Sequence, residues 1–175
     1  GHVIPATILY DHLSKKNNII ISTDKRGVSY LDTNLHNFVI INTPKLNNKI
    51  LIPINLIVIM FLIFKSFFFL KNKKIEKVFS TGGYMSLPLM IAAKLLKLDI
   101  YLLEPNHILG RANKFFLKSC IKIFCYAEKI KNFPDSFKNK MVTIYPLVKK
   151  DLYKINLSYE EKEKFTILIV GDSQG

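Results

Sequence analysis

The sequence predicts an α/β protein built on a doubly wound, mostly parallel β-sheet. Short apolar runs bounded by polar residues alternate along the chain with segments of helical periodicity. Two of the runs end in glycine-containing turns, at 81–86 and 104–110, and each turn leads into a helical pattern. Because strands that alternate with helices pair in parallel, we expect ligands to bind at the carboxyl ends of the strands.

The individual elements follow from this alternation. The first predicted helix covers 5–16, where Pro5 suits an initial helical position. A polar turn at 23–27 and a stretch of ambiguous pattern at 28–36 lie between the first two predicted strands. The predicted strands are short apolar runs, at 18–22, 38–41, 77–80, 100–103, 121–126, 141–145 and 165–170. The other predicted helices are 87–97 and 111–119.

The most apolar stretch of the chain is 50–70. Its length is near the ~20 residues that a membrane-spanning helix needs, but Pro53, Asn55 and Lys65 interrupt it. Phe and Leu beside a basic cluster are typical of a helix that lies in the membrane interface, and this is the interpretation we favour. A true span and a fully buried core helix are the alternatives. The basic cluster consists of Lys71, Lys73, Lys74 and Lys77.

The two glycine turns predict a binding site for phosphate or diphosphate. A strand that ends in a Gly turn and feeds a helix brings free backbone N–H groups and the positive end of a helix dipole to one place. Pro88 fits the first turn of the helix that follows Gly82 and Gly83. A single Gly-Gly turn can be plain fold punctuation, but two in consecutive strand-helix units favour a ligand cleft.

The amino-acid composition indicates which classes of binding partner to expect. The formal net charge is +13, which favours anionic partners such as nucleic acid, anionic lipid or phosphorylated substrates. The richness in Lys, Ile, Asn and Phe is typical of an AT-rich genome, and no basic stripe interleaves with aromatic residues, so we expect no nucleic acid partner. The cysteines, Cys120 and Cys125, match no zinc or redox spacing and are predicted to be buried reduced thiols. We expect no metal and no cofactor.

Four motifs follow one another along the chain. Gly1 and His2, followed by Val-Ile-Pro-Ala, are similar to the end of a Gly-Gly-Thr-Gly-Gly-His-x-x-Pro-Ala loop. The second motif resembles Gly-Gly-Tyr-x-Ser-x-Pro, and its residues are Gly82, Gly83, Tyr84, Ser86 and Pro88. The third resembles His-Glu-Gln-Asn…Gly…Asn-Lys, and its residues are Glu104, Asn106, Gly110, Asn113 and Lys114. The last, 171–175, contains Ser173 and resembles Gly-Gly-Ser-Gln-Gly. In this order and at these spacings, the four motifs resemble those of the MurG family of N-acetylglucosaminyltransferases.

The chain departs from the family pattern at several places. Leu103 and Pro105 stand where the family usually has His and Gln, and Asp172 replaces a Gly. The Asn-Pro-x-Arg segment is present only as 145–149 and is one residue out of step, so the Arg role is not carried onto Lys149. Both ends of the sequence fall inside motifs, and we expect a fragment. The expected domains are an acceptor-binding domain at 1–160, without its first strand, and the start of a donor-binding domain at 161–175.

The resemblance implies a two-domain GT-B glycosyltransferase whose N-terminal domain is Rossmann-like. It implies transfer of N-acetylglucosamine, with inversion, from UDP-N-acetylglucosamine to undecaprenyl-diphospho-muramoyl pentapeptide in peptidoglycan synthesis. The implied location is the cytoplasmic face of the bacterial inner membrane, where the protein binds the anionic surface peripherally. Another GT-B or nucleotide-binding α/β protein, or a non-catalytic membrane protein anchored by 50–70, are the competing hypotheses.

The same resemblance assigns roles to residues. An inverting transfer needs a base near the attacking hydroxyl, and His2 is the candidate, with loop capping or phosphate binding as its alternative role. Asn106 and Ser173 are expected to contact the sugar nucleotide, although Asn is also a common turn former. The remaining expected substrate-binding residues are Gly1, Gly82, Gly83, Tyr84 and Ser86. There is no Asp-x-Asp motif, so no metal-dependent sugar-nucleotide site is expected.

Overall fold

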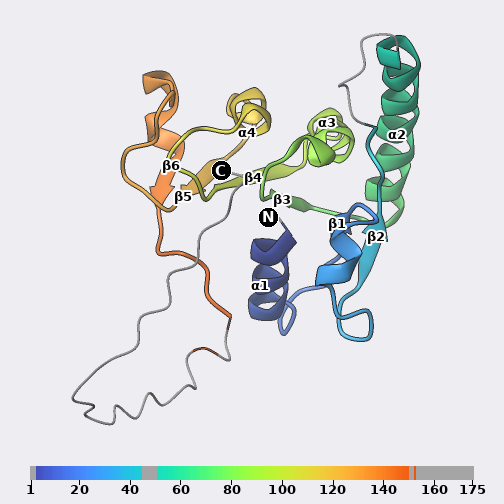
Figure 1. The fold of residues 1–175 in the computed structure, drawn as a ribbon, viewed down its shortest axis with the longest axis horizontal. Helices are drawn as coiled ribbons and strands as arrows, with labels where there is room; N and C mark the ends of the chain where they lie inside the picture. The colour runs from blue at the N-terminus through green and yellow to red at the C-terminus, as the bar shows by residue number, and fades with distance from the viewer. Residues whose placement is uncertain (1–2, 45–50, 150–151, 153–175) are drawn as a thin grey trace, which may run out of the picture.

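The computed structural model describes residues 3–44, 51–149 and 152 as an α/β fold (Figure 1). The α-helices are α1 (Val3–Leu13), α2 (Ile52–Asn72), α3 (Leu87–Leu95) and α4 (Arg111–Phe116). The strands are β1 (Ile21–Thr23), β2 (Phe38–Ile40), β3 (Lys77–Ser80), β4 (Asp99–Glu104), β5 (Lys122–Cys125) and β6 (Met141–Thr143). Short 3-10 helices lie at Gly27–Tyr30, Tyr84–Ser86 and Asp135–Lys140.

All strand pairs in this part of the chain are parallel, as predicted. β3, β4, β5 and β6 form a four-stranded sheet in sequential order, and β1 pairs with β2 in a separate two-stranded sheet. In the described part of the chain the parallel strands thus lie in two sheets, and β1 and β3 share no ladder of hydrogen bonds. A side-chain contact joins the two regions instead: Thr43 Oγ1 donates to the Met85 carbonyl at 3.0 Å.

The core lies between the four-stranded sheet and the helices α2, α3 and α4. α2 and α3 pack along each other, and α3 also contacts β3 and β4. Figure 1 shows α3 and α4 on one side of the strands and α1 on the other, next to β1. The most deeply buried apolar side chains come from each of these elements and include Leu70, Met90, Ile100, Leu102, Phe116 and Ile123.

Two helices end in a left-handed residue that is not glycine. Lys74 follows α2 with φ 51° and Lys97 follows α3 with φ 56°. In each case the next backbone N–H reaches back to a carbonyl of the last turn, Ile75 to Leu70 and Leu98 to Ala93, both at 3.0 Å. The helix predicted at 87–97 therefore stops at Leu95, and the chain turns directly into β4.

The helix predicted at 111–119 is also shorter than expected, and a distant side chain explains its end. The Lys140 ammonium donates to the carbonyls of Leu117, Lys118 and Cys120 at 3.0, 3.0 and 2.7 Å. Carbonyls at a helix terminus have no partner within the helix, and a cation there is also stabilised by the negative end of the helix dipole.

The other predicted elements agree with the structure to different degrees. β3 has the predicted bounds, whereas β1 and α1 are shifted by a few residues. The strand predicted at 165–170 lies outside the described residues.

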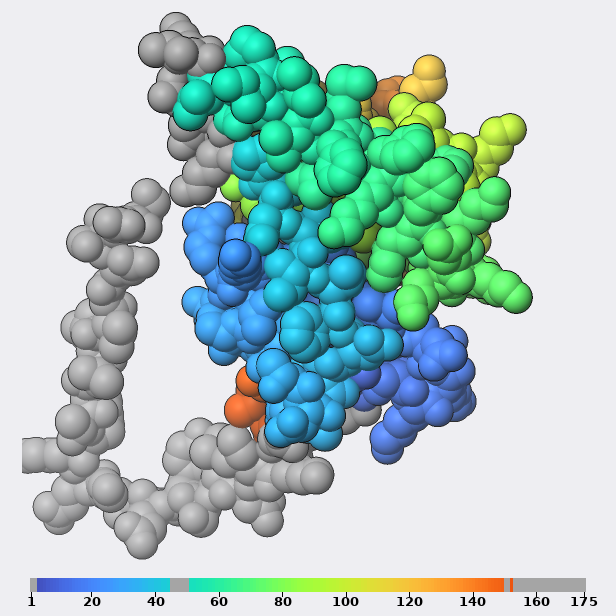
Figure 2. Space-filling model, turned by 90° about the vertical axis from the view of Figure 1, so that its right-hand side faces the viewer, coloured from blue at the N-terminus to red at the C-terminus, as the bar shows by residue number. Residues whose placement is uncertain are grey.

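α2 is the least covered helix. Ser66 and Leu70 are its buried residues, and 11% of its most apolar 18-residue window is buried. Figure 2 shows α2, in teal and green, uncovered across the upper part of the face that it occupies. A fully buried core helix is therefore excluded for this stretch. Among the described residues, α2 is long and apolar enough to cross a membrane by length and composition.

Candidate functional site

A cleft of about 670 Å³ opens at the carboxyl ends of β3 and β4. Its walls are the turn after β3 with the start of α3, and the loop after β4 with α4. The residues that line it are Gly82, Gly83, Tyr84, Leu87, Ile91, Glu104, Asn106, Gly110, Arg111, Ala112, Asn113 and Phe115. Both glycine turns therefore meet in one cavity, at the edge of the sheet where parallel folds bind ligands.

The turn after β3 depends on two glycines with positive φ. Gly82 has φ 91°, and Gly83 combines φ 83° with ψ 147°, a conformation that only glycine adopts without strain. Gly82 N donates to Ser80 Oγ at 3.2 Å, and Ser86 Oγ donates to the Gly83 carbonyl at 2.8 Å. Side chains at both ends of the turn hold the exposed backbone of the glycines against the cleft.

Tyr84 and Ser86, which were both expected to bind substrate, have different positions. Tyr84 lines the cleft, and its hydroxyl is buried without a hydrogen bond of good geometry in the described part of the chain; the Arg26 guanidinium is a neighbouring donor. The hydroxyl is buried beside Arg26, so it is the rest of the Tyr84 side chain that forms the wall of the cleft. Ser86 does not line the cleft, and its hydroxyl serves the turn itself.

The loop after β4 is organised by a buried carboxylate. Glu104 is 1% exposed. Its Oε1 accepts hydrogen bonds from Asn106 N at 3.2 Å and Asn106 Nδ2 at 3.0 Å. Its Oε2 accepts from Gly110 N at 2.7 Å and Asn113 Nδ2 at 3.0 Å. None of the ion pairs found among the described residues involves Glu104, so amide groups alone compensate its burial.

Gly110 lets the loop approach the carboxylate closely. A Cβ placed on it would lie 3.1 Å from Glu104 Oε2, which is closer than most real Cβ contacts. The loop is also tied to the region before the last 3-10 helix, because Leu109 N donates to the Lys131 carbonyl at 3.0 Å and Lys131 N donates to the His107 carbonyl at 2.7 Å. The loop is therefore anchored at its start, middle and end.

The cleft is lined by one exposed cation and one buried carboxylate. Arg111 is exposed at the first position of α4 and lines the cavity, whereas the Glu104 carboxylate is occupied by four donors. Within 3–44, 51–149 and 152, no group of three or more His, Cys, Asp or Glu side chains is placed to hold a metal ion. The cleft thus offers the backbone of the glycine turn, an asparagine and a guanidinium, which suit an anionic and hydroxylated ligand.

Of the residues that the sequence predicted to bind substrate, four line the cleft: Gly82, Gly83, Tyr84 and Asn106. Gly1, His2 and Ser173 lie outside the described residues. Sequence reasoning gave no role to Glu104, Gly110, Arg111, Asn113 or Phe115, all of which line the cavity. Three of them, Glu104, Gly110 and Asn113, belong to the third family motif. The signal available in the sequence was Glu104 itself, an acidic residue directly after the strand predicted at 100–103.

A parallel α/β fold with paired glycine turns at the carboxyl edge is typical of the class of proteins that bind nucleotides or other phosphorylated ligands. Comparison with protein families gives the particular family. The glycosyltransferase family 28 N-terminal domain matches residues 1–125, and the chain belongs to this family.

Two relatives of this chain share the name UDP-N-acetylglucosamine--N-acetylmuramyl-(pentapeptide) pyrophosphoryl-undecaprenol N-acetylglucosamine transferase. The protein of this name from Pelagibacter ubique is 46% identical over 100% of this chain and 49% of its own length. That from Rickettsia felis is 31% identical over 100% of this chain and 51% of its own length. The chain therefore spans about half the length of the curated relatives it matches, and the resemblance to the MurG family is confirmed.

A solved structure supports the fold. The crystal structure of Acinetobacter baumannii MurG superposes with a TM-score of 0.68 at 21% identity, covering 82% of this chain and 42% of that one. The predicted α/β fold, with its mostly parallel strands, is confirmed.

Proposed function

We propose that this chain is the acceptor-binding half of an inverting glycosyltransferase. The reaction moves N-acetylglucosamine from UDP-N-acetylglucosamine to the lipid-linked muramoyl pentapeptide, in peptidoglycan synthesis. The observation that carries the proposal is the cleft at the carboxyl ends of β3 and β4, where both glycine turns meet. Membership of glycosyltransferase family 28 and the name shared by the relatives support the same reaction.

In this proposal the acceptor diphosphate binds the turn at Gly82 and Gly83. The positive φ of both glycines leaves their backbone open to close approach by a ligand, and α3 begins directly beyond the turn. Arg111, across the cleft, adds a fixed positive charge for the same anion. Asn106 contacts the sugar nucleotide from the loop after β4.

His2 is proposed as the base that removes the proton from the acceptor hydroxyl. Imidazole is suited to this work because its ordinary pKa lies near neutral pH. Domains at 1–160 and 161–175 are part of the same proposal, with Ser173 on the donor side and Gly1 beside the base.

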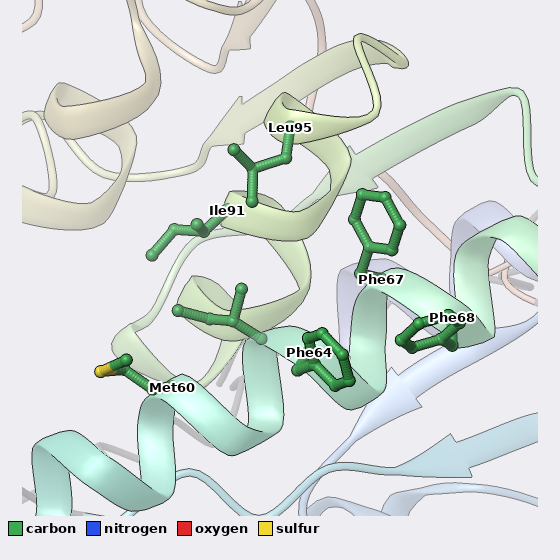
Figure 3. A pocket seen from close by; sticks show the side chains of 7 residues that line it. Met60, Phe64, Phe67, Phe68, Ile91 and Leu95 are labelled. Atoms are coloured by element: carbon green, nitrogen blue, oxygen red, sulfur yellow. The ribbon is translucent and has the colours of Figure 1, made fainter.

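We propose that α2 binds the cytoplasmic surface of the inner membrane peripherally. Its outward face carries Phe, Ile, Leu and Met side chains, among them Phe61 and Phe64, which are 66% and 64% exposed. An apolar groove of about 460 Å³ lies between α2 and α3, and Figure 3 shows Phe64, Ile91 and Leu95 around it. Ile91 also lines the cleft, so the membrane-facing surface and the proposed diphosphate site are neighbours on α3.

The experiment uses a full-length enzyme, in which this chain is continued by the second half that its relatives have. We expect this enzyme to transfer N-acetylglucosamine from UDP-N-acetylglucosamine to a short-chain lipid-linked acceptor. His2→Ala should lower kcat by roughly 10²- to 10⁴-fold with little change in acceptor KM, since general bases contribute on this scale. Lack of transfer by the wild-type enzyme contradicts the proposed function. A large rise in KM with kcat preserved would instead make His2 a binding residue.

A further inference from the structure

One group in the cleft has no part in the reaction proposed above. The Glu104 carboxylate is fully buried and has no cationic partner among the ion pairs of the described chain. An ionised carboxylate can only accept hydrogen bonds, so every group that faces it at bonding distance must present an N–H. The four groups that do so are two backbone amides and two asparagine side chains.

For Asn106 this constraint decides the orientation of the side-chain amide. Its Nδ2 lies 3.0 Å from Glu104 Oε1, and its own backbone N lies 3.2 Å from the same oxygen. The reversed amide would place Oδ1 against a carboxylate oxygen, where two acceptors repel. Oδ1 is therefore on the side of the amide away from Glu104. Asn106 is solvent-exposed and lines the cleft.

We propose that Glu104 is a positioning residue that holds the Asn106 amide with its oxygen presented to the cleft, as an acceptor for a hydroxyl group of the sugar substrate. The inference rests on the proposed function and adds the polarity of one contact: the group recognised by Asn106 is a hydrogen-bond donor. A fixed acceptor of this kind discriminates strongly against an analogue that lacks the hydroxyl, because a polar group then stays unpaired.

The Glu104–Asn106 contact is separable from the contacts that hold the loop. Gly110 and Asn113 bind the other carboxylate oxygen, and Asn113 Nδ2 also donates to the Leu103 carbonyl at 3.0 Å. The middle of the loop is bound to Lys131 through the His107 carbonyl and Leu109 N. A change on the Oε1 side also removes the acceptor of the Asn106 backbone N–H, but it leaves the contacts of Gly110, Asn113 and Lys131 that hold the rest of the loop.

Glu104→Gln makes such a change. The oxygen of the introduced amide can still accept from Gly110 and Asn113, and its NH₂ group then faces Asn106, whose backbone N–H loses its acceptor. This loss is the same in every variant that carries Glu104→Gln. The Asn106 amide must turn over to accept this N–H, which presents Nδ2 to the cleft in place of Oδ1. We expect kcat/KM for UDP-N-acetylglucosamine to fall roughly 10- to 100-fold in the full-length enzyme, in line with the loss of one buried hydrogen bond to an unmatched group.

The double variant Glu104→Gln with Asn106→Asp tests polarity directly. The carboxylate introduced at position 106 accepts from the amide introduced at position 104 with one oxygen and presents its other oxygen to the cleft. We expect the double variant to recover most of the kcat/KM that Glu104→Gln loses, whereas Asn106→Asp alone places two carboxylates together and should be at least as impaired as Glu104→Gln. In the Asn106→Ala background, Glu104→Gln should cause little further loss, because the two residues act as one unit.

Ile100→Val is the matched control. Ile100 is buried on the same strand but does not line the cleft, so this variant should lower the thermal midpoint slightly and leave kcat/KM unchanged. An unchanged kcat/KM in Glu104→Gln overturns the inference while leaving the proposed function intact. So does a double variant that folds with the wild-type midpoint but is no more active than Glu104→Gln. Absence of transfer by the wild-type enzyme overturns the proposed function, and the substrate role of Asn106 falls with it.

Discussion

Glu104 and Cys125 are register partners on the neighbouring strands β4 and β5. Burial and, second, the negative charge of Glu104 raise the pKa of the Cys125 thiol from 9.0 to about 11. Burial also raises the pKa of the Cys120 thiol, against the opposing effect of Lys140. Both cysteines are free and buried, as the sequence predicted, so the folded chain protects them from thiolate chemistry.

We expect Cys125 to resist alkylation in the native chain at pH 8. A pKa raised by about two units leaves ~100-fold less thiolate than an ordinary thiol has, and burial slows access further. Since the folded pKa lies above the unfolded one, the stability from the neutral thiol is present below pH 9 and is lost as the pH rises from 9.0 to about 11. Iodoacetamide labelling followed by peptide mass spectrometry measures the rate. The urea-unfolded chain is the control, and equal rates in both states would refute the prediction.

At the scale of single elements, α2 is the helix whose sequence and surroundings differ most from those of a core helix. Large apolar side chains cover both its outward face and the wall of its groove with α3. Lys71 lies in its last turn, and Lys73 and Lys74 follow directly. Apolar area together with basic residues at one border is the combination that binds amphipathic helices to anionic bilayers.

Replacing Lys71 and Lys73 by Glu should weaken binding of the chain to anionic vesicles by roughly 30-fold or more, since each basic residue near such a surface contributes ~1 kcal/mol. Both side chains are exposed at the end of α2, so the fold should not change. Co-sedimentation with phosphatidylglycerol-containing vesicles at low and high salt measures the effect.

The matched control is Lys15→Glu with Lys16→Glu, which makes the same change in charge just after α1. We expect this control pair to reduce binding much less, because its position is remote from α2. The proposed membrane-binding surface on α2 would be contradicted if vesicle binding did not depend on salt and fell equally in both pairs of variants. Resistance to carbonate extraction would favour a span.

At the scale of the whole molecule, the chain spans about half the length of its relatives, and both glycine turns of its cleft belong to that half. A sugar-nucleotide pocket needs several polar groups arranged around a shaped cavity. In the proposal these groups are provided mainly by the donor domain, which begins at 161.

We expect the 175-residue chain to bind a short-chain acceptor analogue weakly and to transfer no sugar by itself. The turn at Gly82 and Gly83 and the loop around Glu104 remain available for the acceptor and for one side of the donor sugar. Calorimetric titration with the acceptor analogue and, separately, with UDP-N-acetylglucosamine checks this. Donor affinity equal to that of the full-length enzyme, or any transfer, would overturn the assignment of the donor site to the second half.

The local sequence pattern was enough to predict the fold class and half of the cleft. The alternation of apolar runs and helical segments predicted a parallel α/β fold, and β3 lies where the pattern placed it. Glycine turns were recognisable because positive φ restricts the residue type, and Gly82 and Gly83 do adopt it. The short ranges of α3 and α4 were not predictable, because Lys97 takes a left-handed conformation and Lys140 binds carbonyls beyond α4 that lie 20 to 23 residues before it in the chain.

The sequence by itself determined the family of this protein, the parallel strands and the two turns that form the cleft, since each depends on residues that are close together in the chain. Only the tertiary structure decided that α2 is exposed rather than buried, and that Ser86 supports its turn instead of lining the cleft. It also decided the role of Glu104. A lone acidic residue at a strand end has no meaning until the fold brings Asn106, Gly110 and Asn113 around its two oxygens, because hydrogen bonds depend on distance and direction in space rather than on order in the chain.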